Sequence, residues 1–162
     1  MFSDALLTEA RDLLAAAASK DMQIVTAESC TGGLIAALLT EIPGSSEVVD
    51  RGFVTYSNEA KQDLLGVPSD LLETHGAVSE PVCRAMALGA LKNSHAELCV
   101  AVTGIAGPGG GSPEKPVGLV YIAAARRAGD VIVRKYRFGD IGRDKVRLGT
   151  VEKAVQLLRG CL

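Results

Sequence analysis

The chain has 162 residues, of which 48% are hydrophobic and 22% charged, and its formal net charge is −2 at pH 7. A chain of this length buries roughly 70% of the surface that its unfolded state exposes, so it can hold a core without disulfides or a metal. The near-neutral charge and the 4% share of aromatic residues argue against a nucleic-acid partner. We therefore expect one domain over residues 1–162.

The first segment has the pattern of an amphipathic helix over residues 3–18, with Ser3 placed to cap its first turn. Charged residues interrupt the apolar ones at Asp4, Glu9, Arg11 and Asp12. The segment therefore lacks the apolar run of a signal peptide or a membrane span. We expect no membrane partner and a cytoplasmic location.

A short β-favouring run over residues 23–27 leads into a helix over residues 34–40. Ser29 lies at this strand-to-helix junction, where free N–H groups of the helix can face developing negative charge. Gly32 and Gly33, which follow in the same turn, would let a substrate approach the backbone closely. Simple capping of the helix by Ser29 or Thr31 explains the pattern equally well.

The middle of the chain predicts a strand over residues 48–56 and then a short helix that Asn58 caps and that contains Lys61. A further helix is expected from Ser79 to about Asn93, because proline follows in its first turn. These helices separate the second strand from the next one.

The C-terminal half predicts a central strand over residues 98–103, apolar on both faces, and then a Gly- and Pro-rich loop over residues 104–116. A hairpin of residues 117–125 and 131–138 follows, and the last helix comes after Asp140. The whole pattern predicts an α/β fold, a three-layer α/β/α sandwich with a mixed, mostly parallel sheet. The loop reads as a site loop, although a plain connector is the commoner fate of such a composition.

A serine nucleophile needs a base, and the candidates are His75, His95 and Lys61. His95 lies in a polar turn, which favours solvation, and nothing directs His75 toward Ser29. Lys61 is expected in the first turn of its helix, where the helix dipole and burial would both lower its pKa. We expect a neutral Lys61 to accept the hydroxyl proton with Tyr56 as a relay or donor, although isolated lysines are usually solvated.

Cys30 is a rival nucleophile, because helix N-termini favour thiolates, but a buried structural thiol is the plainer interpretation. The four cysteines form no CxxC pair, and two separated histidines supply no zinc spacing. We therefore expect reduced thiols, no metal and no cofactor.

Several motifs occur in one order along the chain: TAESCTGG at 26–33, RGFVTYSN at 51–58 with Lys61, HGAVS at 75–79, VTGIAGPGG at 102–110 and KPVGLV at 115–120. Over nearly its whole length the chain thereby resembles the CinA C-terminal domain family. The resemblance implies an amidohydrolase that converts the carboxamide of nicotinamide mononucleotide to nicotinate mononucleotide and ammonia, a step of pyridine-nucleotide recycling.

In this family resemblance, Ser29 is the nucleophile, Lys61 the base and Tyr56 an aid to proton transfer. The resemblance also implies that an oxyanion is stabilised by backbone groups of the turn after Ser29, at Cys30, Thr31 and Gly32. The resemblance implies three groups of ligand contacts. Thr103 and Gly104 would contribute from the end of a strand, and Gly107, Gly109 and Gly110 from the loop over residues 107–111. One arginine, Arg143 or Arg147, would bind the phosphate.

Family members tend to associate, so the resemblance also implies a homo-oligomer. Longer members carry an N-terminal domain associated with ADP-ribose pyrophosphatase activity, which we do not expect here. Two other functions stay open. One is a nucleotide- or partner-binding module without turnover, linked to competence or the DNA damage response, and the other is a hydrolase of a different amide.

Overall fold

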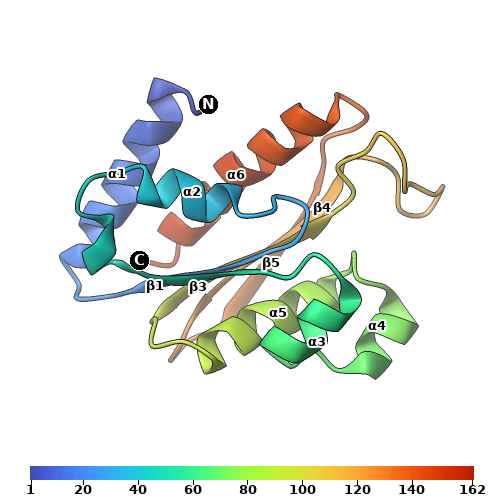
Figure 1. Ribbon diagram of the computed structural model, residues 1–162, viewed down its shortest axis with the longest axis horizontal. Helices are drawn as coiled ribbons and strands as arrows, with labels where there is room; N and C mark the ends of the chain where they lie inside the picture. Colours follow the sequence, from blue (N-terminus) through green and yellow to red (C-terminus); the bar gives the residue numbers. More distant parts are fainter.

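The computed structural model describes all residues from 1 to 162, and five strands form one sheet in the order β2-β1-β3-β4-β5 (Figure 1). The strands are β1 Ile24–Glu28, β2 Val49–Val54, β3 Leu98–Gly104, β4 Leu119–Arg126 and β5 Val131–Arg137. β1 pairs in parallel with β2 and β3, whereas β4 pairs antiparallel with both β3 and β5. Only β4 therefore runs against the direction of the others.

The predicted three-layer α/β fold with a mixed sheet is confirmed. Four of the five strands point the same way, but the neighbouring pairs divide evenly between parallel and antiparallel. The expectation of a mostly parallel sheet is therefore confirmed when strand directions are counted, but not when hydrogen-bonded strand pairs are counted. The reason is that β4 and β5 are both reached without a crossover helix, which parallel neighbours require.

Helices cover both faces of the sheet (Figure 1). One face carries α1 Asp4–Ala18, α2 Leu34–Thr40 and α6 Arg143–Arg159, and the other carries α3 Asn58–Leu65, α4 Ser69–His75 and α5 Glu80–Lys92. A 3₁₀ turn, Ser45–Glu47, precedes β2. None of these helices combines the length and the apolar character that a membrane span requires.

The central strand β3 supplies both cores, since successive side chains of a strand point to opposite faces. Val100 and Val102 join the core under α1, α2 and α6, whereas Cys99 and Ala101 join the core under α4 and α5. All four side chains are fully buried. This double burial explains the unbroken apolar run of the sequence and confirms the central position predicted for it.

The helix boundaries follow local signals in the chain. Ser3 caps α1 by accepting the backbone N–H of Leu6 at 3.2 Å, as predicted. Ser57, rather than Asn58, caps α3 and accepts the N–H of Ala60 at 3.0 Å. The seven-residue helix α4 is not predicted by the sequence analysis, because so short a segment contains only two turns of the helical pattern.

The helix that carries Lys61 packs closely on α5 at Gly89. A Cβ added at Gly89 would lie 1.8 Å from the carbonyl oxygen of Leu65, a backbone atom that cannot rotate away. Helix propensity alone would make Gly89→Ala stabilising by about 1 kcal/mol. We expect the opposite, a free energy of unfolding lower by about 2 to 3 kcal/mol in urea denaturation, because the two helices must separate.

Leu88 offers a matched control on the same helix, since its side chain is 51% exposed. Leu88→Ala should change the free energy of unfolding by less than about 0.5 kcal/mol. A Gly89→Ala protein as stable as the wild type would show that α3 does not need this close contact.

Candidate active site

The carboxyl ends of β1, β2 and β3 lie at the same edge of the sheet, and a pocket of about 250 Å³ opens there. Its lining comes from the last residues of β3, the segments that follow the three strands, the residues before α5 and the first residue of α6: Ser29, Cys30, Tyr56, Asn58, Lys61, Ala77, Val78, Thr103, Gly104, Ala106 and Arg143. Four of the five motifs quoted in the sequence analysis therefore contribute to one pocket.

Ser29 and Lys61 form a buried pair at the base of this pocket. The Lys61 Nζ lies 3.1 Å from the Ser29 Oγ and donates a second hydrogen bond to the carbonyl oxygen of Thr55 at 2.8 Å. Lys61 is 1% exposed and has no carboxylate partner among the ion pairs of the chain. Burial lowers its pKa, since desolvation disfavours the ammonium form. The pair has the distance that proton transfer from a serine to a lysine needs, and the lowered pKa favours the neutral amine that could accept the proton.

Glu28 organises the turn that presents Ser29. Its carboxylate is fully buried and accepts the Thr31 hydroxyl at 2.6 Å. It also accepts three backbone N–H groups at the start of α2: that of Gly33, which precedes the helix, at 3.0 Å, that of Ile35 at 3.0 Å and that of Ala36 at 2.9 Å. The side chain of Ser29 therefore does not cap α2, and the free helix N-terminus that the sequence analysis expects to face the substrate is occupied by Glu28.

Two backbone N–H groups of the turn remain available. Those of Cys30 and Thr31 donate to no acceptor within the chain, whereas the N–H of Gly32 donates to the Ser29 carbonyl at 3.0 Å. Gly32 instead supplies the positive φ of 59° that the turn requires. Of the three positions expected to stabilise an oxyanion, Cys30 and Thr31 therefore have free donors and Gly32 does not.

Cys30 lines the pocket beside Ser29, but its chemistry differs from that of an activated thiol. The residue is 6% exposed, and this burial raises the pKa of the thiol to about 12. The thiol consequently stays protonated near neutrality, whereas the thiolate is the reactive form. The structure favours the structural interpretation of Cys30 over its role as the nucleophile.

Tyr56 and Arg143 lie at the mouth of the pocket. The Tyr56 side chain is 61% exposed, and its hydroxyl accepts a hydrogen bond from the Arg143 guanidinium at 2.9 Å. A second Arg143 nitrogen donates to the carbonyl of Gly107 at 2.8 Å. Tyr56 makes no hydrogen bond to Ser29 or Lys61, so the structure does not bring it into the proton-transfer pair.

The remaining ligand-contact candidates divide into those that line the pocket and those that do not. Thr103 and Gly104 line it, and the Thr103 hydroxyl donates to the Ala77 carbonyl at 2.9 Å. Gly107 lies beside the pocket through its contact with Arg143, whereas Gly109 and Gly110 are exposed outside the lining.

Arg147 lies one helical turn beyond Arg143 but does not line the pocket. Its Nε donates to the carbonyl of Cys30 at 3.1 Å, and a terminal nitrogen donates to the carbonyl of Thr31 at 2.9 Å. Of the two arginines considered for a phosphate, only Arg143 therefore has access to the pocket.

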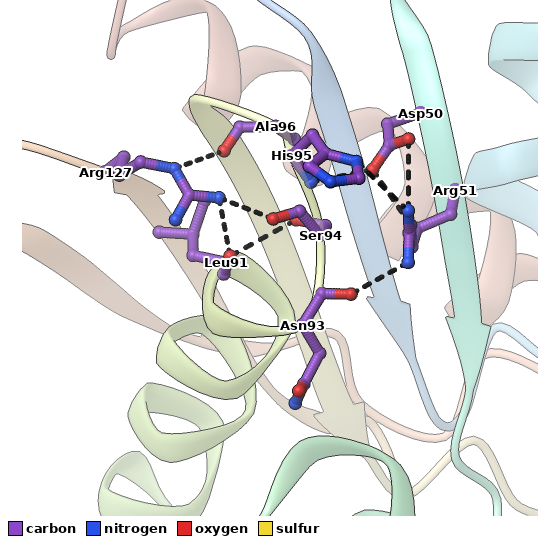
Figure 2. Close-up of polar contacts among 8 residues, drawn as sticks. All are labelled: Asp50, Arg51, Leu91, Asn93, Ser94, His95, Ala96 and Arg127. Carbon is purple, nitrogen blue, oxygen red and sulfur yellow. Dashed lines mark hydrogen bonds and ion pairs between the residues drawn. The ribbon is translucent and has the colours of Figure 1, made fainter.

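Neither histidine lines the pocket that holds Ser29 and Lys61. His95 precedes β3, at the end of the sheet opposite to Ser29, and one strand length of about 20 Å separates the two ends. There its backbone N–H donates to Asp50 and its ring contacts Arg51, in a polar cluster around the end of α5 (Figure 2). His75 is exposed at the end of α4 and outside the pocket lining. Lys61 is the base candidate that the fold brings to Ser29.

The sequence analysis misses five residues of this site. Four of them line the pocket without an assigned role in it, and each lies within a motif that the resemblance quotes: Asn58, Ala77, Val78 and Ala106. Glu28 is also part of such a motif, and its place immediately before Ser29 is the signal that could have identified it. No group of three or more His, Cys, Asp and Glu side chains could hold a metal ion, and all four cysteines are unpaired.

The fold and the pocket define a three-layer α/β protein with a buried serine–lysine pair at the carboxyl edge of its parallel strands. Comparison with known families makes the assignment specific. Residues 7–162 match the family model of the CinA C-terminal domain, and the chain belongs to this family.

Relatives of known sequence and structure agree with this assignment. The chain is 47% identical, over 98% of its length, to a CinA-like protein of Anaeromyxobacter sp. (strain K), of which it spans 40%. It is 54% identical over 83% of its length to the nicotinamide-nucleotide amidohydrolase PncC of Escherichia coli (strain K12), of which the match covers 81%. The crystal structure of the competence/damage inducible protein CihA from Agrobacterium tumefaciens superposes with a TM-score of 0.97 at 54% identity, covering 99% of this chain and 97% of that one.

Proposed function

We propose that the protein hydrolyses the carboxamide of nicotinamide mononucleotide to nicotinate mononucleotide and ammonia, with Ser29 as nucleophile and Lys61 as base. The observation that carries this proposal is the 3.1 Å separation of the Lys61 Nζ and the Ser29 Oγ in a buried pocket. The 54% identity to the Escherichia coli nicotinamide-nucleotide amidohydrolase supports the choice of substrate.

In the first step, the neutral amine of Lys61 takes the hydroxyl proton while the Ser29 oxygen attacks the carboxamide carbon. The carbonyl oxygen becomes negatively charged, and the unpartnered N–H groups of Cys30 and Thr31 stabilise it. Burial assists both events, because it lowers the pKa of Lys61, which favours the neutral amine, and strengthens the hydrogen bonds to the oxyanion.

In the second step, the tetrahedral intermediate collapses, the C–N bond breaks, and the Lys61 ammonium returns its proton to the leaving nitrogen, which departs as ammonia. An ester between Ser29 and the nicotinoyl group remains. Lys61, neutral again, then takes a proton from water, whose oxygen attacks the ester carbon. In the second collapse the bond to the Ser29 oxygen breaks, and the Lys61 ammonium returns its proton to that oxygen. The acid product gives its own proton to solvent and leaves as the carboxylate.

The other end of the substrate carries a phosphate, for which Arg143 is the available cation. Arg143 is the first residue of α6, so its guanidinium and the free N–H groups of that helix start lie on the same side of the pocket mouth. The exposed ring of Tyr56 beside Arg143 offers an aromatic surface to the substrate. In this proposal Tyr56 contacts the ligand and does not relay the proton.

Arg143→Met should raise the KM for nicotinamide mononucleotide by about 10- to 100-fold, because one charge-assisted contact to the phosphate is lost. The KM for nicotinamide riboside, which lacks the phosphate, should change little. Arg134→Met removes an exposed arginine on β5 and should leave both values unaltered. Equal rises in KM for the two substrates would argue against phosphate recognition by Arg143.

Ammonia release from nicotinamide mononucleotide by the wild-type protein, measured with a coupled dehydrogenase, tests the proposed function directly. We expect stoichiometric nicotinate mononucleotide. Binding of the mononucleotide without ammonia would instead support a binding module, and ammonia from other carboxamides alone would support a hydrolase of a different amide.

A further inference from the structure

Arg147 donates hydrogen bonds to the turn that follows Ser29. It reaches from α6 to the turn after β1 and holds two successive carbonyl groups, those of Cys30 and Thr31, at 3.1 and 2.9 Å. The planar guanidinium can hold two acceptors in a fixed relation, which a lysine ammonium cannot do as rigidly. The residue stays outside the pocket lining, so it contacts the turn from the side away from the ligand.

Peptide geometry connects these carbonyl contacts to the free N–H groups. The bond between Cys30 and Thr31 is trans, so the Cys30 C=O and the Thr31 N–H point in opposite directions. When Arg147 holds the Cys30 carbonyl, it directs the Thr31 N–H away from the guanidinium. The Thr31 N–H has no acceptor in the chain and remains available on the other side of the turn.

The preceding peptide is held by a different contact with the same result. The Ser29 carbonyl accepts the Gly32 N–H at 3.0 Å, and the Cys30 N–H therefore also points away from a fixed carbonyl. Glu28 makes a further set of contacts, since its carboxylate accepts the Thr31 hydroxyl and the Ile35 N–H at the start of α2. The turn is thus held by both Arg147 and Glu28, and its uncommitted N–H groups are those of Cys30 and Thr31.

We infer that Arg147 is a positioning residue, which orients the Cys30–Thr31 peptide so that its N–H stabilises the oxyanion formed on the substrate of Ser29. Its positive charge beside the two carbonyls also polarises these peptides and strengthens their N–H groups as donors. This inference rests on the proposed function and replaces the phosphate contact that the family resemblance allows for Arg147.

The test compares Arg147→Met with the wild type in two assays. In the first, kcat for ammonia release should fall by about 10²-fold, the usual effect of losing one oxyanion donor, while KM stays nearly constant. In the second, a fluorophosphonate should label Ser29 of the variant more slowly by a similar factor but to the same final extent. The labelling rate should fall because attack of Ser29 on the reagent also develops negative charge, here on the phosphoryl oxygen. The final extent counts folded sites, so a merely structural role would lower the extent and leave the rate unchanged.

Arg147→Lys keeps the positive charge and reaches one carbonyl, so it should retain more activity than Arg147→Met, with kcat lower than that of the wild type by about 10-fold. This variant carries the test if Arg147→Met does not fold. The inference would be overturned if both variants had the kcat and the labelling rate of the wild type. It would also be overturned if KM rose in the variants while kcat stayed unchanged.

The two assays separate this inference from the proposed function. A wild-type protein that releases no ammonia, but whose Ser29 is labelled quickly and more slowly after Arg147→Met, would overturn the function and retain the positioning role. If the wild type releases ammonia and Arg147→Met changes neither kcat nor the labelling rate, the proposed function is retained and the positioning role is overturned.

Discussion

Replacing Ser29 with alanine should lower kcat for ammonia release from nicotinamide mononucleotide by at least about 10⁴-fold. The expected loss is large because the hydroxyl oxygen itself forms the new bond to the carboxamide carbon. The fold should persist, since Ser29 does not cap α2 and its side chain is partnered only by Lys61. The measurement is the ammonia assay at saturating substrate, together with the thermal unfolding midpoint.

Cys30→Ala is the matched control for this variant, since Cys30 lines the same pocket one residue further along the chain. Its activity should stay within about 10-fold of the wild type, because burial keeps the thiol protonated and only packing is lost. The reverse outcome, an active Ser29→Ala and an inactive Cys30→Ala, would assign the nucleophile to the thiol.

Replacing Lys61 with methionine should lower kcat by about 10²- to 10⁴-fold, the range expected when a general base is removed. Methionine preserves most of the volume and the apolar stem, so the pocket should keep its shape. In the wild type, kcat/KM should rise with pH as Lys61 loses its proton, and the midpoint should lie below the ordinary lysine value of 10.5. A wild-type kcat/KM that does not change with pH below 10.5 would argue against Lys61 as the base.

The same titration predicts how stability depends on pH. Because the pKa of Lys61 is lowered in the folded state, the unfolded chain binds more protons between that pKa and 10.5. The free energy of unfolding of the wild type, minus that of Lys61→Met, should therefore increase as pH rises through this window. Urea denaturation at several pH values measures the difference, and a decrease with pH would contradict a buried neutral amine.

Local patterns in the sequence predict most of the fold and the two central residues of the site. Ser29 is identified by a strand-to-helix turn, and Lys61 by its place in the first turns of a capped helix. Both signals extend over fewer than ten residues. The burial that lowers the pKa of Lys61 cannot be predicted from so short a segment, since it depends on contacts such as that with Ser29, 32 residues away in the sequence.

Tertiary contacts set the side-chain positions that sequence reasoning does not predict. Arg147 is 117 residues from the carbonyl that it holds, and nothing in its helix distinguishes it from Arg143, which reaches the pocket. Tyr56 lies between Thr55 and the cap of α3, close to Lys61 in sequence, yet its side chain turns outward to Arg143. Spacing along a chain predicts which side chains share an edge of the sheet but not which way each of them points.

The most direct measurement is the mass of the peptide that contains Ser29 after the wild-type protein is quenched in acid during turnover of nicotinamide mononucleotide. A serine nucleophile predicts that this peptide carries the acyl group of nicotinate mononucleotide, and that fragment ions place the added mass on Ser29 in both the wild type and Cys30→Ala. Added mass on Cys30 in the wild type would contradict attack by the Ser29 hydroxyl. So would a Cys30→Ala protein that turns over the substrate but whose peptide carries no added mass.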